Sequence, residues 1–113
     1  DKKMVFLLTQ SYYKQLIEAG VRVYEYTPGF VHSKTFVCDD EIATVGTINL
    51  DYRSLYLHFE NGLFLYNNDT VMDIKKDILD TLEDCNRIMP EMCKKNMFFL
   101  LLQGILRIFA PLL

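Results

Sequence analysis

Apolar positions recur every three or four residues over two long stretches of the chain. In the first, residues 3–19, no Gly or Pro interrupts the spacing, and Gly20 follows where a helix C-cap is expected. In the second, the apolar positions start at Val71, just after the N-capping run of residues 68–70, and continue to about Ile88. Both stretches therefore predict amphipathic helices.

Four shorter stretches are rich in the β-branched and aromatic residues that strands favour. The first, residues 21–24, is expected to be a short buried strand that a Pro-Gly pair ends. An acidic turn joins residues 34–38 to residues 42–45, which predicts an antiparallel hairpin, and residues 62–66 form a further strand. The alternation of helices and strands predicts an α/β fold, with a mixed β-sheet sandwiched between helices.

The end of the chain is strongly apolar. Residues 97–113 read MFFLLLQGILRIFAPLL, which is short for a membrane-spanning helix and is interrupted by polar residues, Gly and Pro. Lys94 and Lys95 precede this run, and a basic edge beside an apolar stripe suits an anionic membrane surface. Docking on another part of the protein would bury the same side chains. We therefore divide the chain into residues 1–90 and an apolar tail, residues 91–113, expected to form an interfacial helix.

Composition narrows the class of protein. The 113 residues are about one domain, and 50% hydrophobic against 24% charged residues exclude a disordered chain. A formal net charge of -3 argues against a general nucleic-acid-binding surface. The thiols of Cys38, Cys85 and Cys93 are too few and too irregularly spaced for a disulfide framework or a thiolate zinc site, so we expect reduced cysteines and no metal.

Polar residues concentrate between residues 31 and 62. His32 and Lys34 are separated by one residue, so on an extended chain their side chains leave the same face. An imidazole can act as nucleophile or acid/base near neutral pH, while a lysine and an amide such as Asn49 stabilise charge on phosphoryl oxygens. The pattern therefore predicts chemistry on a phosphate ester.

The spacing of these residues resembles the HKD motif of the phospholipase D superfamily. Every motif position is filled, in the order His32-x-Lys34, four residues, Asp39, six residues, Gly46-Thr47-x-Asn49. Two further runs resemble the bacterial cardiolipin synthases of this superfamily: Asn49-x-Asp51-x-Arg53-Ser54 and Phe59-Glu60-Asn61. The likeness extends over nearly the whole chain, from the opening helix to Pro111-Leu112-Leu113. The chain as a whole resembles the C-terminal end of such an enzyme.

The resemblance implies one lobe of a phospholipase D-like fold, with its first strand absent because the chain starts on a helix. Members of the family have two HKD motifs on two similar lobes, and the two motif histidines face one another across a single active site. This chain has one motif, within residues 1–90. The resemblance therefore implies a catalytic half-domain whose partner is a missing N-terminal HKD half of the same polypeptide.

The family's mechanism implies a phosphatidyl transfer that uses no cofactor or metal. One histidine attacks the phosphorus of phosphatidylglycerol and forms a phosphohistidine, while the other protonates the departing glycerol. A second phosphatidylglycerol then accepts the phosphatidyl group, which yields cardiolipin. By analogy His32 is the general acid/base and not the nucleophile. The implied location is the cytosolic side of the bacterial cytoplasmic membrane, and the chain alone is expected to be inactive.

The resemblance also implies roles for the other motif residues. Lys34 and Asn49 would hold the phosphoryl oxygens, Thr47 would add a hydroxyl contact, and Glu60 would hold the distal imidazole nitrogen and fix its tautomer. Asp39 belongs to the motif, but its place beside a turn suits backbone hydrogen bonding better than substrate contact.

Three neighbouring residues are interpreted as structural. Gly46 is expected to allow a close backbone approach or an unusual dihedral angle. Arg53 is expected to bridge to Asp51 or Glu60, with attraction of anionic head groups as the alternative. His58 has no motif partner and is expected to be an ordinary structural histidine.

Two other functions stay open. A single-motif phosphodiesterase or nuclease could complete its site by homodimerisation, with two His32 side chains facing each other, although the acidic net charge counts against nucleic acid. A non-catalytic membrane-binding module would use the motif residues only to support the fold. Replacement of His32 separates these hypotheses, because only the module would keep its function.

Overall fold

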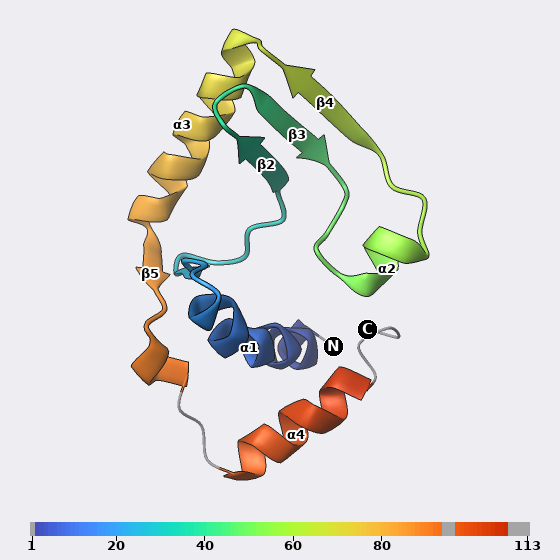
Figure 1. The fold of residues 1–113 in the computed structure, drawn as a ribbon, viewed down its shortest axis with the longest axis vertical. Coiled ribbons are helices and arrows are strands. Elements are labelled where there is room, and N and C mark those ends of the chain that lie inside the picture. Colours follow the sequence, from blue (N-terminus) through green and yellow to red (C-terminus); the bar gives the residue numbers. More distant parts are fainter. Residues whose placement is uncertain (1, 94–96, 109–113) are drawn as a thin grey trace. The chain divides into compact units, whose positions relative to one another are not determined.

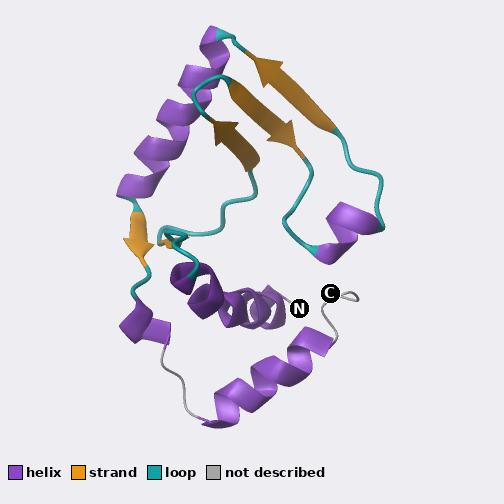
Figure 2. Cartoon of the chain, in the orientation of Figure 1, coloured by secondary structure: helices purple, strands orange, loops and turns teal. Residues whose placement is uncertain are grey.

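The computed structural model describes residues 2–93 and 97–108 (Figures 1 and 2). The chain divides into two compact units, which are described separately below. Unit 1 consists of residues 1–25 and 87–113, and unit 2 of residues 26–86. The chain passes from one unit to the other within β1 (Tyr24–Tyr26) and β5 (Cys85–Arg87), which pair in a two-stranded sheet. The division into residues 1–90 and an apolar tail stays a prediction.

Unit 2 is built on a three-stranded antiparallel sheet. Its strands follow in chain order as β2 (Lys34–Cys38), β3 (Ile42–Gly46) and β4 (Gly62–Tyr66), with β3 in the centre. The register pairs Lys34 with Gly46 and Gly46 in turn with Gly62. The predicted hairpin and the further predicted strand are therefore confirmed.

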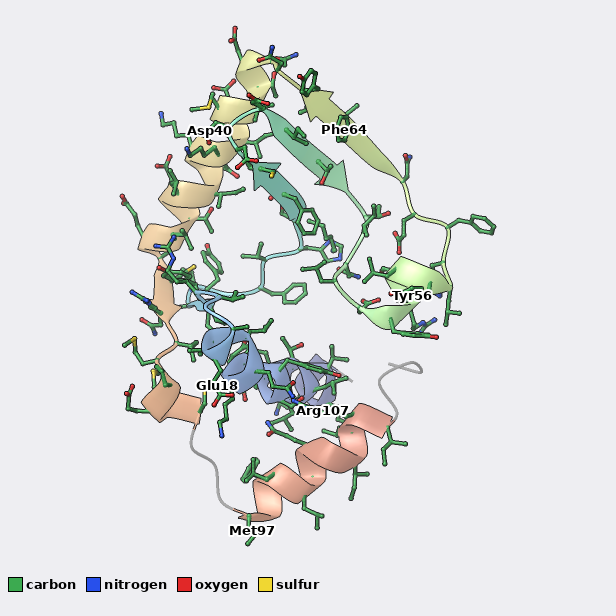
Figure 3. All side chains as sticks on the ribbon, in the orientation of Figure 1. Glu18, Asp40, Tyr56, Phe64, Met97 and Arg107 are labelled. Atoms are coloured by element: carbon green, nitrogen blue, oxygen red, sulfur yellow. The ribbon has the colours of Figure 1, made fainter. Side chains whose placement is uncertain are left out.

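The hairpin turn between β2 and β3 is tight. Asp39 and Asp40 both have positive φ angles, 52° and 60°, and the backbone N–H of Glu41 donates to the carbonyl of Cys38 at 3.1 Å. Asp and Asn tolerate this left-handed region better than other non-Gly residues, so the acidic turn suits the geometry. Asp40 also accepts a hydrogen bond from Lys75 Nζ at 2.6 Å (Figure 3 labels Asp40).

Helix α3 (Asp69–Glu83) covers this sheet and contacts all three strands (Figure 1). Asn68 caps its N-terminus, because its side chain accepts from the N–H of Thr70 at 2.9 Å, as the sequence predicts. The core of unit 2 lies beneath the helix, where Val71 and Ala43 are completely buried.

The sequence-based end of this helix, near Ile88, is wrong. The helix ends at Glu83, and the next residues form β5. The reason is a competing backbone partner: Thr27 donates to the carbonyl of Asp84 from its N–H at 3.2 Å and from its hydroxyl at 2.8 Å. The apolar spacing continued past the helix because strand and helix patterns overlap in short runs.

The α/β class is confirmed, with one correction to the kind of sheet. Within the described residues, every pairing in the three-stranded sheet is antiparallel, so this sheet is not mixed. A parallel pair needs a strand brought back by a crossover, and the strand expected first, β1, pairs with β5 instead. The strand predicted over residues 21–24 begins only at Tyr24, and the residues of β1 are half-buried and not fully buried as predicted.

Apart from its residues of β1 and β5, the described part of unit 1 is mainly helical. Helix α1 (Lys2–Glu18) agrees with the prediction to within one residue, and it packs against the 3₁₀ turn η1 (Pro90–Cys93) and against α4 (Met97–Ile108) (Figure 1). The buried side chains of this unit are those of Leu8, Ile88, Gln103 and Leu106. None of the described helices has the length and apolar character needed to span a membrane. Lys94 and Lys95, predicted to form the basic edge of the tail, lie outside the described residues, as do residues 109–113.

Candidate active site

His32 and Lys34 form a contacting pair at the start of β2. The Lys34 Nζ lies 3.1 Å from His32 Nδ1 and donates a hydrogen bond to the His32 carbonyl at 2.6 Å. The ring of Phe30 packs beside the imidazole, with the ring centroids 5.9 Å apart. His32 is exposed, so the imidazole and the cation lie together on an accessible surface, on the same side of the chain as their spacing predicts.

The contact constrains the imidazole. A lysine ammonium can only donate hydrogen bonds, so Nδ1 of His32 acts as the acceptor wherever this contact is made. A neutral imidazole with a free Nδ1 lone pair carries its proton on Nε2. Lys34 thus selects one tautomer of His32 in this arrangement.

Lys34 and Asn49 line the same surface groove, which has a volume of about 400 Å³. One side of the groove comes from β2 and from the loop after β3, where Asn49 lies, and the other side comes from α3. Asp77 and Thr81 are the polar side chains that α3 contributes. His32 is not among the described residues that line this groove, so it lies next to Lys34 but outside the groove.

Thr47 and Glu60 form a second cluster. The Thr47 hydroxyl donates to Oε2 of Glu60, and the Thr47 hydroxyl oxygen accepts from the N–H of Asn61 at 3.0 Å. The Thr47 N–H donates to the carbonyl of Asn61 at 2.9 Å. These bonds tie the end of β3 to the residues that lead into β4. The loop that carries Asn49 therefore begins at a fixed point.

The pKa of the Glu60 carboxyl lies below its ordinary value of 4.5. The hydrogen bond from Thr47 is the main cause, and a hydrogen bond from Ser54 adds to it, because both favour the charged form. The bond expected between Glu60 and His32 is not present among the described residues. Glu60 is instead occupied by two hydroxyl groups.

Ser54, which has no predicted role of its own, belongs to the site. It lies in the short helix α2 (Tyr52–Tyr56), is 9% exposed, and its N–H donates to Asp51 Oδ1 at 2.7 Å. Asp is a preferred N-cap residue, so Asp51 could have indicated this helix. The side chain of Ser54 hydrogen-bonds to the Glu60 carboxylate and so helps to hold it in place.

The expected partners of Arg53 are wrong. Arg53 approaches His58, with its Nε 3.3 Å and its second terminal nitrogen 3.2 Å from the His58 Nε2. The carboxylates of Asp51 and Glu60 are already engaged, one as a helix cap and the other by hydroxyl groups. Arg53 is thus a local structural bridge, as expected, but to a histidine.

Gly46 stands where two backbones meet. A Cβ at this position would overlap the carbonyl oxygen of Asn61 and lie 2.7 Å from Cα of Gly62. The expected close approach is confirmed, and it explains why the motif position is a glycine.

Asp39 lies in the hairpin turn described above. Its Oδ2 accepts from the Cys38 thiol at 3.4 Å, and this bond is the main reason that the pKa of Cys38 is raised. The turn geometry supports the structural interpretation of Asp39. No cluster of three or more His, Cys, Asp or Glu side chains suited to a metal ion occurs in the described part of the chain.

Comparison with known proteins agrees with the motif. The family described as "Cardiolipin synthase, PLD-like domain" matches residues 1–82, which is well over half of the chain. The chain belongs to this family of phospholipase D-like domains. The resemblance drawn from the HKD motif is therefore confirmed.

Relatives of this phospholipase D-like domain match the whole chain. A cardiolipin synthase of Halalkalibacterium halodurans is 43% identical and one of a Geobacillus species 40%, each over 100% of this chain and 23% of the relative. An uncharacterized protein of Streptococcus mutans is 47% identical over 25% of its length. The domain thus spans about a quarter of the length of the curated relatives it matches. No solved structure matches it.

Proposed function

We propose that this chain is the second HKD half of a cardiolipin synthase, a phosphatidyltransferase of the phospholipase D superfamily. The observation that carries the proposal is the His32–Lys34 pair beside a groove that Lys34 shares with Asn49. The chain covers only about a quarter of the cardiolipin synthases it resembles. The first HKD half would come from the same polypeptide, and the chain alone would be inactive or nearly so.

In the proposed reaction the histidine of the first half attacks the phosphorus of phosphatidylglycerol. A P–N bond forms and the P–O bond to glycerol breaks, while His32 gives a proton to the departing glycerol oxygen. His32 then takes a proton from the hydroxyl of a second phosphatidylglycerol, which attacks the phosphohistidine. The P–N bond breaks, cardiolipin forms, and both histidines return to their starting state.

The Lys34 contact links phosphate binding to the position of the His32 imidazole. Lys34 Nζ lies 3.1 Å from Nδ1 of His32, which accepts in this contact. A phosphate that binds Lys34 would draw the ammonium away from Nδ1. Substrate binding would therefore release Nδ1 of His32 from this contact.

Thr47 and Glu60 would act as positioning residues. Their hydrogen bonds hold the loop that begins after β3, and Asn49 lies on that loop. The amide of Asn49 and the ammonium of Lys34 would then stabilise charge on the phosphoryl oxygens. Asp39 would support the hairpin that carries Lys34 at its other end.

A chimera tests the proposal. The matching segment of the Halalkalibacterium halodurans cardiolipin synthase is replaced by this chain, and cardiolipin formation is measured on phosphatidylglycerol vesicles with EDTA present. We expect the chimera to be active and the isolated 113-residue chain to be inactive. Replacement of the motif histidine, His32→Ala, should lower the rate of the chimera by about 10²–10⁴-fold, the usual contribution of an acid/base residue.

His58→Ala is the matched control, because the described hydrogen bonds of His58 go to Arg53 and not to the motif. This variant should keep most of the activity. An active His32→Ala chimera would contradict the proposal and support the membrane-binding module. Metal-independent phosphodiester cleavage by a dimer of the isolated chain would instead support the single-motif enzyme.

The substrate and location follow from the same proposal. An anionic phospholipid, phosphatidylglycerol, is the proposed substrate, and the cytosolic side of the bacterial cytoplasmic membrane is the proposed location. The apolar tail would contact the membrane surface. Nucleic acid is not a proposed partner.

A further inference from the structure

The inward side of α4 carries polar side chains beside the buried Leu106. Its two polar side chains are turned inward: Gln103 is only 6% exposed and donates to the carbonyl of Leu7 at 3.4 Å. Arg107 donates to the hydroxyl of Ser11 at 3.0 Å and to its carbonyl, and its guanidinium lies 4.5 Å from the ring centre of Tyr12. Figure 3 shows Arg107 on the side of α4 that faces α1.

The exposed residues of α4 whose side chains are described are all apolar, apart from one glycine. Five of them share one side of the helix: Met97, Leu100, Leu101, Ile105 and Ile108, with exposed fractions from 48% to 85%. Phe99, 40% exposed, lies on the other side. We call the five residues the outer row. A helix that met water on this side would carry polar residues there, so the row requires an apolar environment.

A polar groove of about 370 Å³ runs between α1 and α4 and borders the outer row. Leu100 belongs to both, since it lines the groove and is exposed. The charged side chains of the groove are Lys14, Glu18 and Arg107, and Lys14 lies 3.8 Å from Glu18. Two cations against one carboxylate leave a charge of +1, in a chain whose formal net charge is -3.

The outer row therefore suits lipid acyl chains, and the adjacent groove, with its charge of +1, suits a phosphate. A phospholipid has this combination in one molecule, with an anionic phosphodiester next to its acyl chains. A second protein surface would have to supply an apolar patch and an anion in the same register. The charge complementarity favours the lipid.

We propose that the groove between α1 and α4 binds the headgroup phosphate of an anionic phospholipid of the bilayer, while the outer row contacts the acyl chains. This inference goes beyond the proposed function, because it assigns a second lipid-binding site to unit 1, whereas the residues of the HKD motif belong to unit 2. It does not depend on phosphatidyl transfer. Lys14 would contact the phosphate, and Arg107 would place its charge at the wall of the groove.

Vesicle flotation of the purified 113-residue chain tests the proposal without any turnover. We expect binding to phosphatidylcholine vesicles that contain phosphatidylglycerol, and weaker binding to phosphatidylcholine alone. Lys14→Gln should weaken binding to the anionic vesicles about fivefold, as expected for one cation near an anionic surface, and should leave neutral vesicles unaffected. Lys76→Gln is the matched control, because it removes the same charge from an exposed position of unit 2.

The outer row is tested with Leu101→Gln, which should weaken binding to both kinds of vesicle by about tenfold. Leu79→Gln is the control, because Leu79 is an exposed leucine on α3, 52% exposed against 66% for Leu101. Circular dichroism of each variant verifies that the helices persist. If Leu101→Gln unfolds, the Lys14→Gln pair still decides whether the groove contributes.

Three outcomes would overturn the proposal. The first is equal binding by Lys14→Gln and Lys76→Gln. The second is a self-associated chain that Leu101→Gln converts to a monomer while vesicle binding stays unchanged, which would make a second copy the occupant. The third is complete competition by soluble glycerol phosphate, which would show a site for a free phosphate ester and not for a bilayer lipid.

Discussion

Helices α3 and α4 are both amphipathic and differ in the side chains that they bury. In α3, Val71 is completely buried against the sheet, while Lys76 and Asp80 are exposed. In α4, Gln103 is buried beside Leu106 and Arg107 is half-buried, while the leucines and isoleucines of the outer row are exposed. Apolar residues recur at helical spacing in both helices. The helices differ in the polarity of the side chains that face the rest of their unit.

The spacing of apolar residues therefore predicts a helix and its stripes but not the environment of each stripe. In α3 the apolar stripe meets a sheet, so burial of apolar area stabilises the unit in the usual way. In α4 the polar side chains of Gln103 and Arg107 face α1 and hydrogen-bond to it, beside the buried Leu106, and the outer row stays exposed. Three substitutions or conditions test how far this contrast extends.

The largest effect is expected where the sheet beneath α3 is most closely packed. Gly46→Ala should lower the free energy of unfolding by about 3 kcal/mol, because the added Cβ would overlap the backbone of Asn61. Urea denaturation followed by circular dichroism measures this change. Gly29→Ala is the control, since no atom lies within 4 Å of a Cβ built there. Equal stability of the two variants would contradict the close approach.

A smaller effect is expected for the inward polar stripe of α4. Arg107→Met keeps an apolar stem but removes the hydrogen bonds to Ser11, and should cost about 2 kcal/mol of unfolding free energy. Lys14→Met on α1 is the control and should change stability by less than about 0.5 kcal/mol, because its ion pair is exposed and 3.8 Å long. Both values come from urea denaturation. If Arg107→Met stabilises the chain, then α4 has ordinary polarity and the contrast with α3 fails.

The smallest effect is a pH dependence confined to the Glu60 cluster. The pKa of Glu60 in the folded chain lies below the ordinary 4.5, so its contribution to stability is complete above that pH and is lost as the pH falls through the folded-state pKa. Glu60→Gln cannot titrate and should lose less stability than the wild type on acidification from pH 7. Urea midpoints across the acid range give the comparison. Parallel pH profiles for the two chains would contradict the lowered pKa.

Much of the fold could be predicted from the sequence, because local signals decide it. The helix start at Asn68, the turn at Asp39 and Asp40, and the glycine at Gly46 each follow from a backbone requirement that few residue types meet. The end of α3 could not be predicted, because it depends on Thr27, which is distant in sequence and takes the carbonyl of Asp84. The sheet's purely antiparallel pairing depends on a similarly distant choice of partner.

The candidate site shows the same division. The pairing of His32 with Lys34 follows from their spacing on one extended segment. The partner of Arg53 could not be predicted, because Arg53 lies in α2, a helix too short for a periodic signal. Asp51 caps this helix and is therefore engaged by the N–H of Ser54. The hydroxyl of Ser54 hydrogen-bonds to Glu60. Neither carboxylate therefore pairs with Arg53.

The tight turn between β2 and β3 has a consequence for the order of folding. Cys38 pairs with Ile42 across three residues, whereas Gly46 and Gly62 meet only after residues 47–61 have closed a loop. Closing a longer loop costs more chain entropy, and short hairpins form within microseconds. The strand that carries Lys34 therefore acquires its register first, and Thr47 and Glu60 meet in a later step, when the third strand joins an existing template.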